Sequence, residues 1–142
     1  MKIERTVETT ASPAAVFAYL SDFTNTEQWD PGTVRTTRAS GDGGVGTTYH
    51  NVSKFAGRET ELTYLVTEHQ PDSRFALRGE NKTVVARDTM EMVPNGTGTR
   101  VTYTADFEFT GLVKYAAPLL APAFKKLGDE AEKGLRESLA TL

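Results

Sequence analysis

The pattern of hydrophobic and polar residues divides the chain into an early strand, two short helices, a run of strands and a long last helix. Residues 2–9 alternate between the two kinds of side chain, which is typical of a half-buried strand. Ser12 and Pro13 suit the N-cap and the first turn of a following helix. A second short helix is expected over residues 22–31, since Pro31 disfavours helix at the residue before it.

The middle of the chain predicts six further strands joined by tight turns. Glycine, proline, asparagine and aspartate cluster between β-rich segments, as they do in turns. The expected strands are residues 34–39, 47–55, 58–69, 74–79, 83–93 and 99–110. Consecutive strands with such short connections are antiparallel, so the seven strands together predict one antiparallel sheet.

The hydrophobic period changes to three or four residues after Gly111, which predicts a long amphipathic helix. Its regular part is expected over residues 120–138. Pro118 and Pro122 predict a kinked or separate first piece, because proline inside a helix removes a hydrogen bond and clashes with the preceding turn. This order of elements is that of an α+β domain in which a curved sheet is covered by one long helix.

Composition narrows the possible classes of protein. The 142 residues fit a single domain over 1–142, and 38% hydrophobic with 25% charged residues is a globular composition. A net charge of −3 argues against nucleic acid as a partner. The absence of cysteine excludes disulfides, thiolate metal sites and a cysteine nucleophile. The start of the chain resembles no signal peptide and no stretch is long and apolar enough to span a bilayer, so a cytoplasmic protein without stable membrane insertion is expected.

Two familiar binding motifs are excluded by their context. Gly41-x-Gly43-x-x-Gly46 has the spacing of a dinucleotide-binding loop, but a β-rich segment follows it where that motif requires a helix. It is interpreted as a glycine-rich hairpin. His50 and His69 have no metal-ligand partners at suitable spacing, so no metal site and no other cofactor is expected.

Several local motifs accompany the predicted elements in a characteristic order. They are Ser12-Pro13-x-x-Val16-Phe17, Leu20-Ser21-Asp22, Trp29-x-Pro31, Gly46 before a strand, and Gly96-x-Gly98-Thr99-Arg100-Val101. With this order, the whole chain resembles the polyketide cyclase/dehydrase group of the START-like (SRPBCC, helix-grip) superfamily. The resemblance implies a seven-stranded antiparallel sheet that grips the C-terminal helix, with an apolar cavity between them. It implies no single reaction, because the superfamily includes carriers, sensors, cyclases and hydrolytic enzymes.

Alternation along the strands predicts which side chains face this cavity. The odd positions of residues 99–110 and the even positions of 83–93 and 58–69 are the more apolar, whereas parity does not decide for 47–55. With the apolar face of the last helix, the expected lining residues are Leu62, Tyr64, Phe75, Met90, Tyr103, Phe107, Leu120 and Phe124. The alternative for each of them is ordinary hydrophobic core.

Four residues are candidates for polar or aromatic ligand contacts. Asp88 falls on an otherwise apolar face, where a carboxylate must find a partner or shift its pKa upward, and it is the candidate acid or base. The alternative is an ion pair with Arg87 or Arg78, or exposure to water. Tyr64 and Tyr103 could orient a ligand carbonyl. The resemblance also places Trp29 near the cavity, although it could instead close the helix pair against the sheet.

Three classes of function remain open. The first is binding or transport of a small hydrophobic molecule, such as a lipid, a polyketide or an isoprenoid-like compound. The second is an enzyme of the cyclase, dehydratase or isomerase type acting on such a ligand, with Asp88 and a tyrosine as its acid–base set. The third is a protein-interaction module of the same fold. A monomer or homodimer is expected in each case.

Overall fold

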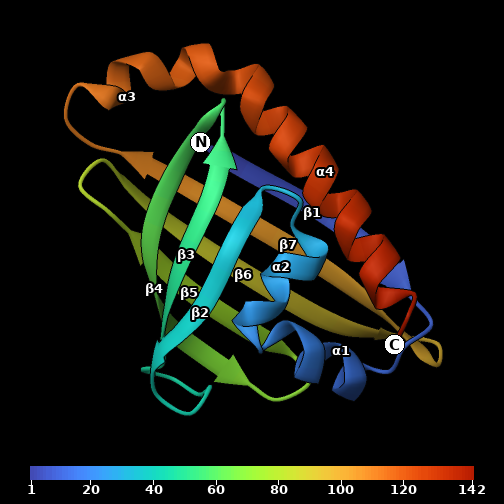
Figure 1. Ribbon diagram of the computed structural model, residues 1–142. Helices are drawn as coiled ribbons and strands as arrows, with labels where there is room; N and C mark the ends of the chain where they lie inside the picture. Colours follow the sequence, from blue (N-terminus) through green and yellow to red (C-terminus); the bar gives the residue numbers. More distant parts are fainter.

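A seven-stranded antiparallel sheet forms the larger layer of the structure, a computed structural model that describes residues 1–142 (Figure 1). Its strands are β1 (Lys2–Thr9), β2 (Thr33–Ser40), β3 (Thr48–Phe55), β4 (Arg58–Gln70), β5 (Arg74–Glu80), β6 (Val84–Asn95) and β7 (Gly98–Phe109). They lie in the order β1-β7-β6-β5-β4-β3-β2, so the first strand pairs with the last. Every expected strand is present, with ends within two residues of those expected from the sequence.

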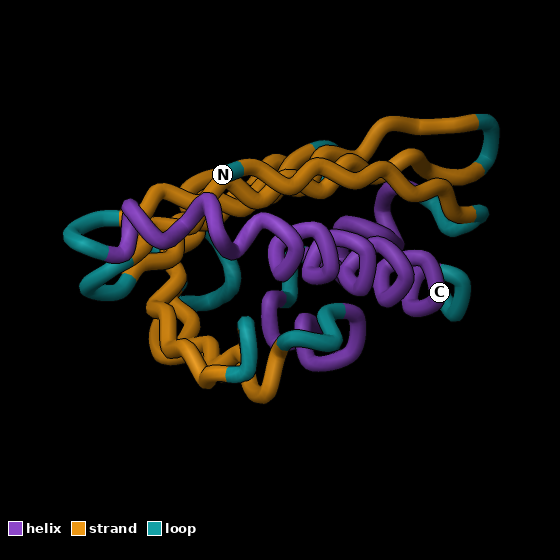
Figure 2. Tube along the Cα trace, turned by 90° about the horizontal axis from the view of Figure 1, so that it is seen from above, coloured by secondary structure: helices purple, strands orange, loops and turns teal.

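The helices lie against one face of this sheet. They are α1 (Pro13–Leu20), the 3₁₀ turn η1 (Phe23–Asn25), α2 (Thr26–Trp29), α3 (Val113–Ala116), the 3₁₀ turn η2 (Ala117–Leu120) and α4 (Ala121–Leu139). The expected second helix is therefore split into η1 and α2. The long helix follows two separate short pieces, as its two prolines predicted. Figure 2 shows the sheet bending around α4, with the short N-terminal helices beside that helix. None of the helices is long and apolar enough to cross a membrane.

A glycine brings α4 close to α2. A Cβ atom at Gly134 would lie 1.8 Å from the backbone oxygen of Trp29, a separation that no side chain tolerates. Glycine at this position therefore allows the end of α2 to pack directly against α4. This contact fixes Trp29 and the adjoining Asp30 at one end of the space between α4 and the sheet.

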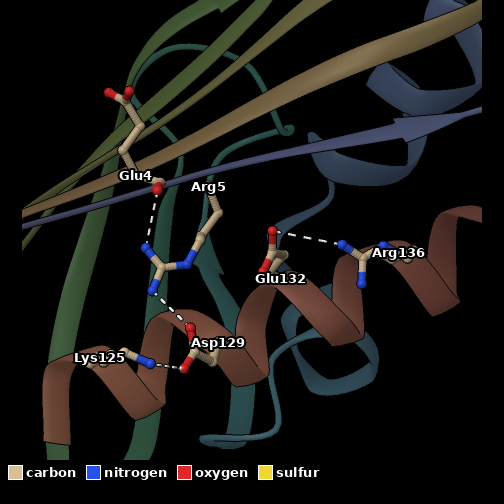
Figure 3. A network of polar contacts seen from close by, with 6 residues as sticks. All are labelled: Glu4, Arg5, Lys125, Asp129, Glu132 and Arg136. Atoms are coloured by element: carbon tan, nitrogen blue, oxygen red, sulfur yellow. Dashed lines mark hydrogen bonds and ion pairs between the residues drawn. The ribbon is translucent and has the colours of Figure 1, made fainter. Parts of the chain in front are cut away.

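An ion pair joins β1 to α4 (Figure 3). Arg5 follows the inward parity of β1, and its Nη2 donates a hydrogen bond to Oδ1 of Asp129 at 3.0 Å while Nη1 donates to the backbone oxygen of Glu4. Lys125 donates to the other oxygen of Asp129 at 2.9 Å. Together, Lys125 and Arg5 lower the pKa of Asp129, so the carboxylate is ionised at neutral pH and ties the helix to the edge strand.

Candidate functional site: a cavity between the sheet and the last helix

A cavity of about 540 Å³ lies between the concave face of the sheet and α4. Most of the residues around it are hydrophobic, 17 of 28. Such a volume and lining are typical of sites for small, largely apolar molecules, which occupy cavities of roughly 300–1,000 Å³.

The structure brings most of the predicted site residues together around this cavity. Those that line it are Trp29, Leu62, Tyr64, Asp88, Tyr103, Phe107, Leu120 and Phe124. The inward parities expected for β4, β6 and β7 are confirmed by the burial of these strands. The undecided strand β3 contributes its odd positions Asn51, Ser53 and Phe55, although Val52 is buried as well.

Phe75 and Met90 do not line the cavity, contrary to the sequence-based expectation. Both are fully buried, in the same hydrophobic cluster as Phe17 and Leu20 of α1. They face inward as predicted, but α1 packs over this part of β5 and β6 and fills the space in front of them. They therefore belong to the packed core.

Aromatic rings form one end of the cavity, next to α3 and η2. The ring of Phe124 lies 4.6 Å from Phe55, 5.0 Å from Phe107 and 5.7 Å from Phe109, measured between ring centroids. Leu120 completes this end from η2. The four phenylalanines come from β3, β7 and α4, so this aromatic cluster joins the helix to the strands next to the two edges of the sheet.

Asp88 gives the cavity its main polar feature. Asp88 lies on the cavity side of β6 and only 5% of the residue is exposed. Its Oδ1 has no hydrogen-bond partner. The two arginines that were alternative partners bind elsewhere, since Arg87 pairs with Glu108 at 3.1 Å and Arg78 with Glu80 at 3.4 Å. Burial, with a smaller effect of the negative charge on Asp30, raises the pKa of Asp88 from 3.8 to about 7.

A second carboxyl group, on Asp30, also lines the cavity. Asp30 is half-buried at the end of α2, where its oxygens accept hydrogen bonds from the backbone N–H of Gly32 and the hydroxyl of Thr33, both at 3.0 Å. Burial raises the pKa of Asp30, the two hydrogen bonds partly offset this, and Glu130 adds a small increase. Sequence reasoning missed this residue, because only the fold shows that the end of α2 faces the cavity.

Two tyrosines flank the carboxyl groups. Tyr64 and Tyr103 are buried, and burial, followed by the nearby negative charge of Asp88, raises the pKa of each phenol well above its ordinary value. Both hydroxyls therefore stay protonated at neutral pH. The indole of Trp29 meets Tyr103 edge to face at 5.4 Å, and its buried Nε1 has no hydrogen-bond partner in the protein.

Other polar residues near this end are satisfied by one another. The Thr36 hydroxyl bonds to the Thr26 hydroxyl at 2.6 Å and accepts from Asn51 at 2.8 Å. The Ser53 hydroxyl in turn donates to Asn51 at 2.8 Å. Buried polar atoms nearly always have hydrogen-bond partners. Oδ1 of Asp88 and Nε1 of Trp29 have none in the protein, so they are the two atoms to which a ligand could form a hydrogen bond.

A family model described as polyketide cyclase/dehydrase and lipid transport matches residues 1–140 of the chain. The chain belongs to this family. This match confirms the family predicted from the sequence motifs, and the START-like fold predicted with it is confirmed as well. A comparison with curated protein sequences finds no match.

Solved structures share the fold of this family member over nearly their whole length. The Zhui aromatase/cyclase from Streptomyces sp. R1128 is 15% identical with a TM-score of 0.82, over 98% of this chain and 93% of that one. A START superfamily protein from Mycobacterium smegmatis is 17% identical with a TM-score of 0.80, over 97% and 96%. The protein TTHA0849 from Thermus thermophilus is also 17% identical with a TM-score of 0.80, over 98% and 97%.

Proposed function

We propose that this protein binds or carries a small hydrophobic molecule in the cavity between the sheet and α4. The observation that carries the proposal is the cavity itself, about 540 Å³ in volume and mostly apolar in lining. A filled interior would have favoured an interaction module of the same fold. The family's description includes lipid transport, which agrees with a carrier.

Binding of a neutral fluorescent probe, N-phenyl-1-naphthylamine, tests this proposal. We expect the fluorescence of the probe to rise with the native protein and to rise less with Leu62→Trp, since Leu62 lines the cavity and an indole there would take up part of its volume. The matched control is Leu65→Trp, because Leu65 lies on the outer face of the same strand and is 42% exposed. Equal binding by both variants would place the probe outside the cavity and contradict the proposal.

A second candidate function is acid–base catalysis on the bound molecule. The observation that favours it is the near-neutral pKa of Asp88, about 7, in a cavity that also holds the hydroxyls of Tyr64 and Tyr103. A carboxyl group with this pKa can both accept and donate a proton at physiological pH. One neighbour of the same fold is an aromatase/cyclase, which makes cyclisation or dehydration the reaction type to test first.

The two candidates are separated by Asp88→Asn. The ligand would first be identified by native mass spectrometry of protein purified from its own host. If the protein is an enzyme, the variant abolishes conversion of that ligand even at concentrations that saturate the variant. If the protein is a carrier, the ligand is recovered unchanged from the native protein as well.

A further inference from the structure

Two carboxyl groups that line the cavity form no ion pair with the protein. They are Asp88 of β6 and Asp30, which directly follows α2. Their negative charges contribute to the raised pKa of Tyr64 in β4 and of Tyr103 in β7. Glu130 of α4 adds a further negative charge beside Asp30. None of the ion pairs in the structure involves either aspartate. Glu130 is paired with Lys126 at 3.8 Å, whereas the two aspartates have no ion-pair partner in the protein.

The basic residues near the cavity do not pair with Asp30 or Asp88. Lys54 and Arg58 line it from the β3–β4 hairpin, whose tip lies beside the start of α4 in Figure 1. The backbone N–H of Lys54 donates to the oxygen of Gly32, close to Asp30, but the side chain of Lys54 is exposed and forms no ion pair with either aspartate. Arg5 is paired with Asp129 of α4 at 3.0 Å. No basic side chain is therefore paired with Asp30 or Asp88, and a cationic ligand would supply the missing partner.

Aromatic rings surround the same two carboxyl groups. Trp29 and Tyr103 pack together at 5.4 Å, and Tyr64 packs on Phe23 at 4.8 Å. The faces of such rings attract cations, most strongly when water is excluded. A cavity wall that combines aromatic rings with carboxylates that form no ion pair is complementary to an ammonium group.

The cavity also has a direction from apolar to polar. Inward positions of β7 run from Phe109 through Phe107 to Ala105 and Tyr103, away from α3, and Asp88 pairs in register with Ala105. Asp88 thus lies deeper than the rings around Phe124. A ligand that fills the cavity has its apolar part among the phenylalanines and its polar part at the aspartates.

We propose that the ligand carries one cationic nitrogen, a protonated amine or a quaternary ammonium, on an otherwise apolar body, and that this nitrogen lies between Asp88 and Asp30. The inference rests on the proposed function, because it requires a ligand in the cavity. A neutral ligand would satisfy Oδ1 of Asp88 but would leave both carboxyl groups without a counter-charge. A cation stabilises both carboxylates at once.

Displacement of bound N-phenyl-1-naphthylamine by three decyl compounds tests the inference. Decyltrimethylammonium, 1-decanol and decanoate share one tail and differ in charge; the two ions are used below their micelle concentrations and the alcohol below its solubility limit. At about pH 8.5 we expect the cation to displace the probe at a concentration about tenfold lower than the alcohol, equivalent to ~1.4 kcal/mol. Decanoate should be the weakest of the three, because both carboxyl groups repel it.

Two variants locate the effect. Asp88→Asn should remove most of the cation's advantage, since it deletes the deeper of the two charges. Asp106→Asn makes the same chemical change on the outer face of β7, where the side chain is 55% exposed, and should keep the advantage. Equal loss in both variants would mean that the cation responds only to net charge, which would overturn the inference.

The pH dependence of the native protein gives an independent readout. A quaternary ammonium keeps its charge at every pH, so its affinity should fall between about pH 8.5 and 5.5 as Asp88 takes up a proton, while that of 1-decanol stays constant. Equal displacement by all three compounds would overturn the inference and leave hydrophobic binding intact. Failure of the probe to bind at all would instead overturn the proposed function.

Discussion

The ring of Tyr64 lies directly against the backbone of Gly79. The two residues are opposite each other in the β4–β5 pair, and a Cβ atom at position 79 would lie 2.6 Å from Cε1 of the ring. Glycine therefore provides the space in which the ring lies across β5. This arrangement sets how far Tyr64 projects into the cavity and so helps to determine the position of its hydroxyl.

Gly79→Ala should destabilise the protein and change its binding. The added methyl group must push the Tyr64 ring toward the cavity, and overpacking of this kind typically costs about 1–3 kcal/mol. Urea denaturation measures the loss of stability, and probe titration measures the change in affinity. The control is Gly44→Ala, where the added Cβ atom would lie 3.4 Å from its nearest neighbour, a flexible Asp42 oxygen. Equal stability of the two variants would show that Tyr64 has room to move.

Asp88→Asn should stabilise the protein at alkaline pH and have little effect near pH 4. The folded protein holds the Asp88 proton up to a pKa of about 7, whereas the unfolded chain releases it near 3.8. The folded state thus binds more protons between these values, and the free energy of unfolding falls as the pH rises through them. A shift of this size corresponds to a loss on the order of 4 kcal/mol above pH 7, of which the asparagine variant should recover a part.

Urea denaturation of both proteins from about pH 4 to 8 measures this difference. Asp106→Asn serves as the control, because an exposed carboxylate should give no comparable pH-dependent gain. A loss of stability in Asp88→Asn at about pH 8 would mean that the native carboxylate has a favourable partner, contrary to its unpaired oxygen in the structure.

Strand periodicity was enough to predict much of this site. Tyr64, Asp88 and Tyr103 each follow the more apolar parity of their strand, and all three line the cavity. Parity gives the face of the sheet on which a side chain lies, but it does not give the depth. Phe75 and Met90 are on the correct face and still belong to the core, because α1 covers them.

Two other features depend on tertiary contacts that periodicity does not contain. Both Asn51 and Val52 of β3 are buried, so neither face of that strand is plainly outer. Asn51 tolerates burial because Thr36, on the neighbouring strand, accepts its hydrogen bond. Asp30 has the sequence signal of an ordinary helix end, and only the packing of α2 on α4 turns it toward the cavity.

Arg5→Met should loosen the attachment of α4 to β1. The change keeps the packing of the aliphatic stem and removes the hydrogen bond to Asp129. We expect faster amide hydrogen exchange in the middle of α4 with only a small loss of global stability, since ion pairs with exposed partners contribute little. The control is Arg100→Met, which removes the pair with Glu8 on the outer face of the sheet. Unchanged exchange in α4 would show that apolar packing alone holds the helix.

The double substitution of Pro118 and Pro122 by alanine should slow the release of bound ligand. Pro118 lies at the start of η2 and Pro122 at the start of α4. The two prolines therefore separate η2 from α3 and α4 from η2. Leu120, between them, lines the cavity, and Leu119 is 82% exposed. We expect alanine to let α4 extend back through η2, which holds Leu120 over the cavity more firmly.

Stopped-flow release of N-phenyl-1-naphthylamine into excess unlabelled competitor measures this effect. The release rate should fall while the urea midpoint changes little, because Pro118 and Pro122 occupy first-turn positions that a helix tolerates. Pro71→Ala, in the turn between β4 and β5, controls for a general effect of removing a proline. An unchanged rate in the double variant, or an equal change in the control, would mean that release does not pass through the η2 segment.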